Sequence, residues 1–570
     1  MRKGTYVLII LVIFFVLLTV TFASFFYFQF SKAPTVKANS FLELRLTGEI
    51  QEKPGPDIMT LLYLKPTALS MHDIWTNLQK AKVDSRISAV VLRMGNLVCD
   101  WAKVNEIRDL ILDFRASGKK AYAYIEEAID FDKEYYLATA CDEVVLHPQG
   151  FLIINGIGGY IPFVKQALDK LGVEAEVEHV EDYKTAYHMF TEEKLTPAHR
   201  EMLDSLYASL YQQYVREVAT ARGKSEEDVR DLIDHGFFQG ESAQEAGLVD
   251  SLLYEDQFIE MLMGDRSKIT RVTHQQYLRI NPTSLGLNRG RKVALIYGMG
   301  PIISGSGMYG IMGSETVSRW IRRARQDKAV AAIVFRVDSP GGSAVASDSI
   351  WREVVLAKKE KPFIVSMSDM AGSGGYQVAM AAHRIVAHPQ TLTGSIGVIF
   401  AKINLRELYA KLGITAEKIQ YGERADMFST FRQATSEERL LLKQEILKTY
   451  DHFITKAAEG RRMSKEEIDR IGKGRVWTGA QALELGLVDE LGGLSRAIAI
   501  AKELAGIADQ DPVRLEVWPK KISFWDMAWG RRTVRLDAGL PPRVKKLLST
   551  LSLLDRNVPW ALMPFWLPTD

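Results

Sequence analysis

The chain has 570 residues, of which 47% are hydrophobic and 25% charged, a composition that excludes a disordered, collagen-like or low-complexity protein. Its 72 lysines and arginines stand against 70 aspartates and glutamates, and the resulting net charge of +2 argues against nucleic acid as the main partner. The two cysteines are too few for a disulfide framework or a four-cysteine zinc site. No cluster of His, Cys, Asp and Glu has metal-ligand spacing, so we expect no metal and no cofactor.

An uncharged, largely apolar run occupies residues 4–31 and is long enough to cross a bilayer as a helix. A cleaved signal peptide usually has a shorter apolar core and a small-residue cleavage site, so we predict an uncleaved transmembrane anchor over residues 5–30. Aromatic residues at 25–28 suit the membrane interface. Basic residues flank the run on both sides, and only a small charge bias favours an N-terminus inside with the bulk of the chain outside.

Four segments of the first part of the chain recur, in the same order, in the second part. The pairs are 41–50 with 293–302, 84–93 with 327–336, 144–149 with 385–390, and 247–250 with 486–489. Their offsets drift slowly, from 252 to 239, which indicates a duplication rather than a short repeat. We predict two similar domains, 40–280 and 290–508, joined by the turn-rich stretch 281–290.

Within each copy, short β-rich apolar runs alternate with helical patterns, as at 329–337, 347–357, 361–366 and 374–382. This alternation predicts βαβ units and a mostly parallel sheet covered by helices, which is an α/β fold. A long helix is expected over 437–460 with Ser436 as its N-cap, and its counterpart over 198–223.

Three glycine turns follow predicted strands in the second copy: Asp338-Ser-Pro-Gly-Gly-Ser343, Met370-Ala-Gly-Ser-Gly-Gly-Tyr376 and Thr391-Leu-Thr-Gly-Ser-Ile-Gly397. They are expected at one end of the sheet, where open α/β sheets place ligands. Ser373 would lie at a strand-to-helix turn, and neighbouring backbone N–H groups would serve a developing oxyanion. Plain βα connections are the alternative for each turn taken alone, and no GxxxxGK[ST] string supports a phosphate loop.

The first copy lacks these features. MGNLVC at 94–99 stands opposite the first glycine turn, and Asp132 stands opposite Ser373 when Tyr135 is aligned with Tyr376. The first copy instead carries DYKTA at 182–186, whose counterpart near 422–426 has no lysine. Taken alone, Lys184 would be a solvated surface lysine, but the asymmetry suggests a site shared between the copies.

The strings VDSPGGS, MAGSGGY, HPQTLTGSIG and DYKTAY, in this layout, resemble the family of signal peptide peptidase A, or protease IV, in its long duplicated form. The resemblance runs from the anchor to about residue 508 and leaves a tryptophan-rich tail, 509–570. It implies two tandem domains with a fold like that of Clp proteases and crotonases. Asp338 departs from the family, which usually has Asn there; Gly372, and Met189 where a proline is common, are further departures.

The resemblance also implies a serine peptidase with a Ser/Lys dyad. In it Ser373 is the nucleophile, Lys184 the general base, Ser395 a residue that orients the lysine amine, and the oxyanion backbone comes from Gly341, Gly342 and Gly374. Burial would lower the pKa of the lysine from about 10.4 and leave a neutral amine to take the serine proton. A Ser/His mechanism using His188, His383 or His388 is the nearest alternative, although histidines at such positions are more often structural.

The expected function is that of a membrane-anchored endopeptidase acting on apolar peptides, above all cleaved signal peptides. Membrane lipid is expected as a partner through the anchor, and the resemblance implies ring-like homo-oligomers in a bacterial cytoplasmic (inner) membrane with the catalytic body on the periplasmic side. A crotonase-like acyl-CoA enzyme, which needs neither dyad nor anchor, and a non-catalytic peptide-binding scaffold are the alternatives. The tail either lies at the membrane interface or packs on the body or on a neighbouring subunit.

Overall fold

The computed structural model describes residues 35–53, 69–126, 131–264, 268–520 and 560–562, with a few helical residues between 11 and 21. Within these residues, no helix combines the length and apolar character needed to cross a membrane. The predicted anchor at 5–30 falls almost wholly outside the described residues, as does most of the tail beyond 520.

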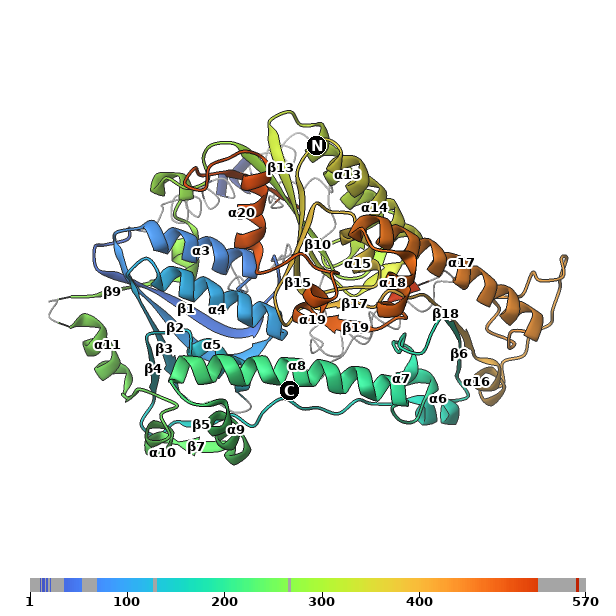
Figure 1. The fold of residues 1–570 in the computed structure, drawn as a ribbon, viewed down its shortest axis with the longest axis horizontal. Coiled ribbons are helices and arrows are strands. Elements are labelled where there is room, and N and C mark those ends of the chain that lie inside the picture. Colours follow the sequence, from blue (N-terminus) through green and yellow to red (C-terminus); the bar gives the residue numbers. More distant parts are fainter. Residues whose placement is uncertain are drawn as a thin grey trace.

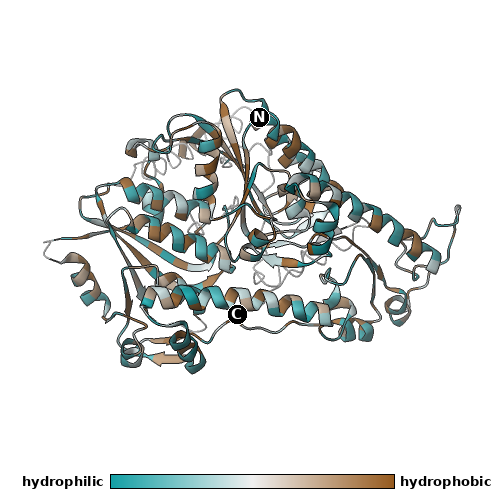
Figure 2. Cartoon of the chain, viewed as in Figure 1, coloured by the Kyte–Doolittle hydropathy of each residue, from teal (hydrophilic) through white to brown (hydrophobic). Residues whose placement is uncertain are grey.

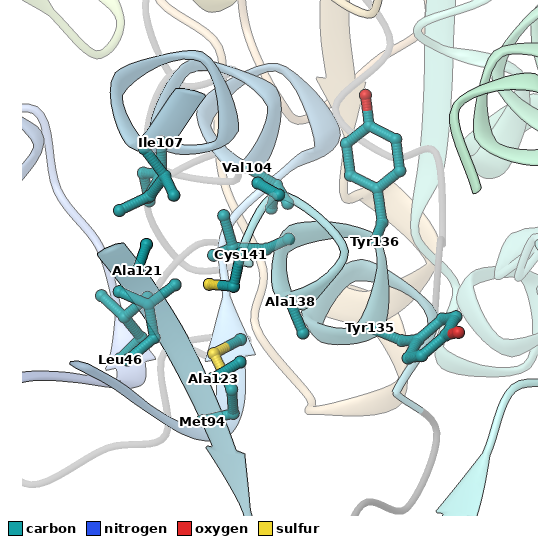
Figure 3. Packing of buried hydrophobic residues seen from close by; sticks show 14 of the residues in the cluster. Leu46, Met94, Val104, Ile107, Ala121, Ala123, Tyr135, Tyr136, Ala138 and Cys141 are labelled. Carbon is teal, nitrogen blue, oxygen red and sulfur yellow. The ribbon is translucent and has the colours of Figure 1, made fainter. Parts of the chain in front are cut away.

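The first half is built on a six-stranded parallel sheet in the order β8-β4-β3-β2-β1-β9. Its strands are β1 (Ser40–Glu49), β2 (Ile87–Val98), β3 (Lys120–Ile125), β4 (Glu143–Leu146), β8 (Ser251–Leu252) and β9 (Thr270–Thr273). Helices connect the strands as the βαβ pattern requires; they are α3 (Met71–Val83), α4 (Trp101–Arg115) and α5 (Asp132–Ala138). The core lies between sheet and helices, and Figure 3 shows Val104 and Ile107 of α4 in one cluster with Ala121 and Ala123 of β3.

The second half repeats this plan in an eight-stranded sheet. Its strands are β10 (Lys292–Met299), β13 (Val330–Ser339), β15 (Phe363–Gly372), β16 (Arg384–Ala387), β17 (Leu392–Gly394), β19 (Val476–Thr478), β20 (Glu490–Leu491) and β21 (Arg514–Trp518). The path β21-β10-β13-β15-β16-β20 matches β9-β1-β2-β3-β4-β8 strand for strand. The corresponding helices are α13 (Ser314–Gln326), α14 (Ala344–Lys358) and α15 (Gly374–Ala379). The predicted α/β class is confirmed, and the two halves lie side by side in Figure 1.

β21 extends the second half beyond the point where the sequence analysis ended it. It pairs with β10 as a parallel edge strand, so residues 514–518 belong to the sheet although they were assigned to the tail. The first half shows why: its β9 occupies the same edge position beside β1. Edge strands at the end of a repeat are short and therefore leave little periodic signal in the sequence.

Two long helices form the second repeated element, α8 (Pro197–Arg222) and α17 (Ser436–Arg461). The expected N-cap Ser436 is wrong by one residue: the Thr435 hydroxyl accepts the Glu438 amide, and the Glu438 carboxylate accepts the Thr435 amide. This reciprocal capping box satisfies two amides at once, which a cap at Ser436 would not do. Figure 1 shows α8 running beneath both halves, and Figure 2 shows hydrophilic residues along much of its length.

Smaller elements complete the structure. They are β5 (Phe151–Ile153) and β7 (Phe237–Gln239), which pair with each other, and α6 (Lys165–Leu171), α7 (His188–Thr191), α9 (Glu226–His235), α10 (Gly240–Glu245), α11 (Glu255–Met263), α12 (His274–Leu278), η1 (Pro282–Leu285), α16 (Arg406–Lys411), α18 (Lys465–Ile471), α19 (Gly479–Glu484) and α20 (Leu494–Leu504).

A third sheet joins the halves, in the order β12-β11-β14-β22-β18-β6. Its strands are β6 (Glu174–His179), β11 (Ile302–Ile303), β12 (Met312–Gly313), β14 (Gly341–Ser343), β18 (Ile399–Asn404) and β22 (Trp560–Leu562). β6 of the first half pairs antiparallel with β18 of the second. β22, from the tail, lies antiparallel between β14 and β18.

A buried ionic contact also fastens the halves together. The Arg336 guanidinium on β13 is 1% exposed and pairs with Glu52 at 2.9 Å and with Glu106 of α4. Its remaining donors bond Ser366 Oγ and the Met367 carbonyl in its own half. Because a buried charge without partners is costly, this arrangement fixes the second half against the first.

Candidate active site

Ser373 occupies the turn between β15 and α15, as the glycine pattern predicts. It is fully buried and has φ 54° and ψ −112°, a backbone conformation that residues with a side chain rarely adopt. Its amide donates to the Gly394 carbonyl at 2.8 Å, which ties this turn to the next glycine turn. Such strain costs about 1–3 kcal/mol and is typically found where a side chain must be presented for chemistry.

Lys184 comes from the first half and reaches the same point. It lies between β6 and α7 in a stretch without regular secondary structure, and its Nζ is 2.6 Å from Ser373 Oγ. Nζ also donates to Ser395 Oγ and to the Ser395 carbonyl, each at 2.9 Å. The serine and the lysine that the sequence analysis singled out therefore meet within one chain.

The backbone of Lys184 is held by glycines of the second half. A Cβ added at Gly474, whose φ is +81°, would lie 2.5 Å from the Lys184 amide nitrogen, so only glycine permits this contact. At Gly397 a Cβ would lie 3.2 Å from the lysine Cδ. Glycine backbone thus packs closely against both the main chain and the side chain of Lys184.

The surroundings of Lys184 disfavour a charge. The side chain is fully buried, and desolvation holds the pKa of its amine well below that of a free lysine. Nearby lies a small apolar cluster that includes Met202 and Leu206 of α8 together with Met370 and Val476 of the second half. Side chains of both halves thus help to exclude water from the region of the amine.

Ser395 follows β17 and is also fully buried, with φ +50°. Its amide donates to the Arg475 carbonyl at 2.6 Å, and its hydroxyl and carbonyl both contact Lys184 Nζ. Ser395 therefore contacts the lysine with two groups and holds the amine in place beside Ser373.

The glycines of the first two turns lie against one another. A Cβ on Gly374 would lie 2.5 Å from Ser347 Oγ and 3.2 Å from the Gly342 amide nitrogen. Gly341 has φ +99°, and its amide donates to Ser339 Oγ at 3.2 Å. The three glycines proposed for the oxyanion backbone are thus brought together next to Ser373, and a side chain at Gly374 would separate them.

Asp338 does carry its charge close to this loop, and the structure shows where the charge goes. One carboxylate oxygen pairs with Lys103 Nζ of α4 at 2.8 Å, and the other accepts the Met370 amide at 3.3 Å. Lys103 also pairs with Asp369 at 2.9 Å. The sequence analysis missed Lys103 and Asp369, because neither stands in a motif and their contact joins residues far apart in the chain.

The histidines considered as an alternative base have other partners. His188 Nδ1 lies 3.3 Å from His199 Nδ1, His383 Nδ1 accepts the Phe363 amide, and His388 Nδ1 lies 3.0 Å from Asn105 Nδ2. No hydrogen bond found among the described residues joins any of them to Ser373. The part of the chain that the structure covers also has no group of three or more His, Cys, Asp or Glu placed to hold a metal ion.

A buried serine on a strained strand-to-helix turn, in hydrogen-bond contact with a buried amine, defines the class of serine hydrolases. The sequence comparison narrows this class, because the pattern of peptidase family S49 matches residues 113–268 and 356–508, once in each half. The chain belongs to peptidase family S49 and is a serine peptidase. This membership decides against the acyl-CoA enzyme and the non-catalytic scaffold.

Individual relatives agree with the family assignment. The chain is 38% identical over 483 residues to the chloroplastic serine protease SPPA of Arabidopsis thaliana, which covers 83% of this chain and 70% of that protein. It is 32% identical over 496 residues to protease 4 of Salmonella typhi, covering 84% and 78%. ClpP1 from Listeria monocytogenes is a structural neighbour at 17% identity and a TM-score of 0.23, covering 35% of this chain and 89% of that one. At this level of overlap, the expected likeness to Clp proteases and crotonases stays a prediction.

Proposed function

We propose that this peptidase works with a Ser/Lys dyad in which Ser373 is the nucleophile and Lys184 the general base. The observation that carries the proposal is the 2.6 Å separation of Lys184 Nζ and Ser373 Oγ in a fully buried setting. A serine hydroxyl needs a nearby base to become nucleophilic, and a lysine serves only when it is neutral. Desolvation lowers the pKa of Lys184 in the direction that this role requires.

A neutral Lys184 amine has two N–H donors and one lone pair. In the proposed reactive form, the two N–H groups donate to Ser395 Oγ and the Ser395 carbonyl. The Ser373 hydroxyl, which also lies 3.3 Å from the Gly397 carbonyl, turns its proton to the lone pair of Nζ. As Oγ bonds to the peptide carbonyl carbon, its proton passes to Nζ. The resulting ammonium gives that proton to the departing amine when the C–N bond breaks. Water, deprotonated by the same amine, then releases the acyl group from Ser373.

The glycine turns are proposed to hold the oxyanion of the tetrahedral intermediate. The support for this proposal is that Gly341 and Gly342 pack directly against Gly374, the residue after Ser373. Backbone N–H groups fixed before the reaction stabilise developing charge without reorganisation. Ser395 is proposed to orient the amine rather than to react.

An extended peptide is proposed as the substrate, held by its backbone. The pairing of β22 with β14 and β18 supports this, because it places an extended segment antiparallel to Gly341, Gly342 and Ser343. Strand addition of this kind reads backbone hydrogen bonds and tolerates varied side chains. We propose apolar peptides, and cleaved signal peptides in particular, since a membrane anchor would hold the site beside them.

The anchor at 5–30, a bacterial inner-membrane location with the catalytic body on the periplasmic side, and a homo-oligomeric state are part of the same proposal. The uncharged run at 4–31 supports the anchor. Resistance to extraction from membranes at alkaline pH, and its loss on deleting residues 1–31, tests the anchor; cross-linking of the detergent-solubilised chain tests the assembly.

The dyad is tested with detergent-solubilised full-length protein and an apolar signal-peptide substrate. Ser373→Ala and Lys184→Ala are expected to lose activity by at least about 10³-fold. The matched controls are Asp132→Ala, at the equivalent position of the first half, and Lys473→Ala, an exposed lysine that pairs with Glu181. Both controls are expected to retain activity. Full activity in folded Lys184→Ala would reject the dyad and return attention to the histidines.

A further inference from the structure

Lys103 stands behind the glycine turns without belonging to them. It lies in the first turn of α4, in the first half, and its side chain is 8% exposed. Its Nζ contacts two carboxylates of the second half, Asp338 at 2.8 Å and Asp369 at 2.9 Å. A single ammonium from one half therefore bridges two strands of the other.

The two carboxylates stand at informative places. Asp338 is near the end of β13, three residues before Gly341, and Asp369 is near the end of β15, four residues before Ser373. The strand that leads to the glycine loop and the strand that leads to the nucleophile are thus joined through Lys103 just before both reach the site.

The sheet itself does not hold these two strand ends in regular register. Val337 pairs with Met367, but the next pair is Ser339 with Ala371, so β15 carries two extra residues over this step. A bulge of this kind breaks the ladder locally and re-aims side chains. Here it contains Asp369, and Lys103 spans the strands where the ladder is interrupted.

The bulge also anchors the helix that carries the lysine. Asp369 accepts the Lys103 amide at 2.9 Å and the Asp100 amide at 3.3 Å, while the N-cap residue Asp100 makes no side-chain capping bond of its own. Asp369 therefore caps α4 from the other half. The contact works in both directions: Asp369 in the bulge accepts amides at the start of α4, and the Lys103 ammonium of α4 pairs with Asp369.

We propose that Lys103 is a positioning residue of the peptidase reaction: by holding Asp338 and Asp369 together, it sets the separation of the glycine loop and Ser373. This inference rests on the proposed roles of Ser373 and the glycine turns. Without the ammonium, two carboxylates that are 18% and 5% exposed would keep their backbone amide partners but lose their counter-charge, and their repulsion would move the strand ends apart. A small misplacement at that point weakens stabilisation of the transition state more than it weakens binding of the extended peptide.

The central test is Lys103→Met in the full-length, detergent-solubilised enzyme. We expect kcat to fall by about 10–100-fold, with KM for an apolar peptide unchanged within about 3-fold. Replacing one of the two carboxylates should then relieve the repulsion, so Asp338→Asn is expected to raise kcat in the Lys103→Met background. This double variant also keeps the test available if Lys103→Met alone folds poorly.

Arg108 provides the matched control on the same helix. Its guanidinium is buried, but its partners, the Tyr136 carbonyl, Thr139 and Glu217, all lie in the first half. Arg108→Met should lower thermal stability and leave kcat per active site unchanged, with active sites counted by burst titration. An equal fall in kcat in both variants would show general loosening and overturn the inference. Wild-type kcat in Lys103→Met, or no gain from adding Asp338→Asn, would also overturn it.

A fluorophosphonate probe separates this inference from the proposed function. Peptide mapping of the labelled wild-type enzyme identifies the reactive serine whatever Lys103 does. Labelling at a serine other than Ser373 would reject the proposed dyad. Labelling at Ser373 at the same rate in wild type and Lys103→Met would leave the dyad intact and reject only the positioning role.

Discussion

The two halves share a scaffold but differ where α5 and α15 begin. In the second half, Gly375 lies so close to the first glycine turn that a Cβ there would be 2.6 Å from the Ser339 carbonyl oxygen. In the first half the equivalent residue is Glu134, and its carboxylate accepts the amide of Leu97, in the segment opposite the first glycine turn. Where the second half has a glycine packed against a backbone carbonyl, the first half therefore has a carboxylate that accepts a backbone amide.

This difference shows how little separates a catalytic copy from a structural one. Burial raises the pKa of Glu134 to about 7. The first half thus holds a buried carboxyl group at the position where the second half has a glycine. Asp132, opposite Ser373, is an ordinary first residue of a helix whose carboxylate accepts the Asn155 and Gly156 amides at 3.1 Å each. The first half keeps the architecture and contributes only Lys184 to the dyad proposed here.

The largest effect on stability is expected when the two arginines at equivalent strand positions, Arg93 and Arg336, are replaced in turn. Arg336→Met leaves Glu52 and Glu106 buried without their partner, which should cost about 3–5 kcal/mol in the free energy of unfolding. Arg93→Met should cost only about 1–2 kcal/mol. Its partner Glu255 is 52% exposed and becomes hydrated, and its buried partner Glu43 keeps ion pairs with Arg45 and Arg271. Urea unfolding of both variants measures the difference, and equal costs would show that the interface between halves carries no special share of stability.

The next largest effect, a loss of activity, is expected at Gly375, where the backbone leaves no room for a side chain. Gly375→Ala should push α15 away from the Ser339 carbonyl and lower kcat/KM by about 10²–10³-fold, the cost of losing an oxyanion contact. Gly158→Ala is the control, because a Cβ there meets nothing within 4 Å. Peptide hydrolysis by the two variants gives the comparison. A Gly375→Ala enzyme with full activity would mean that the close approach in the second half has no catalytic purpose.

A smaller effect separates two fully buried lysines. Lys184→Met should abolish activity, yet it should raise Tm by roughly 2–4 °C for each kcal/mol gained in stability. The stability gain is expected because the unfolded chain binds a proton that the folded amine gives up, so burying this lysine costs folding free energy. That penalty is full below the lowered folded-state pKa and vanishes as pH rises toward the ordinary lysine pKa of about 10.4, so the gain should shrink at alkaline pH. Lys80→Met should instead lower Tm, because Lys80 Nζ donates to the Tyr277 and Ile280 carbonyls.

Calorimetry from about pH 6 to about pH 10 provides the measurement. The same scan of kcat/KM should show activity rising with pH to a plateau that is reached well below the ordinary lysine pKa, since the neutral amine is the active form. A Lys184→Met protein less stable than wild type throughout this range would contradict the view that the amine is held neutral at a cost.

The smallest effect is expected in the first half, at Glu134. Glu134→Gln should leave activity unchanged within about two-fold, because it lies outside the reacting site. It should raise Tm at pH 8 but not near pH 4. Burial raises the pKa of Glu134 in the folded state to about 7, so at pH 8 the carboxyl is ionised in the unfolded chain and its burial destabilises the folded state. Near pH 4 the folded carboxyl is protonated, and this cost largely disappears. Thermal melts at the two pH values measure this. A clear loss of activity would show that the first half influences the chemistry through more than Lys184.

The sequence predicts the elements near the site well, because their signals are local. Glycine turns after strands place Ser373, Ser395 and Gly341, and the comparison of the two copies draws attention to Lys184 even though a lone lysine carries no signal. What the sequence does not reveal are contacts between distant residues. The fate of the Asp338 charge depends on Lys103, which lies 235 positions away and follows no motif.

Other misses have equally physical causes. β21 is a short edge strand with little periodicity, so its place beside β10 is visible only once the two sheets are compared. Ser436 and Thr435 are both suitable N-caps by residue type, and the choice falls to Thr435 because Glu438 completes a capping box there.

The contact of Lys184 with Gly474 has a consequence for the order in which the site forms during translation. The ribosome makes the lysine first and then another 474 − 184 = 290 residues before the glycine appears, which takes roughly 15–60 s at about 5–20 residues per second. Until then the contact that helps to bury the amine cannot form, and a lysine amine in water keeps its proton. On the proposed roles, a chain that has not yet reached residue 474 is expected to lack the complete dyad.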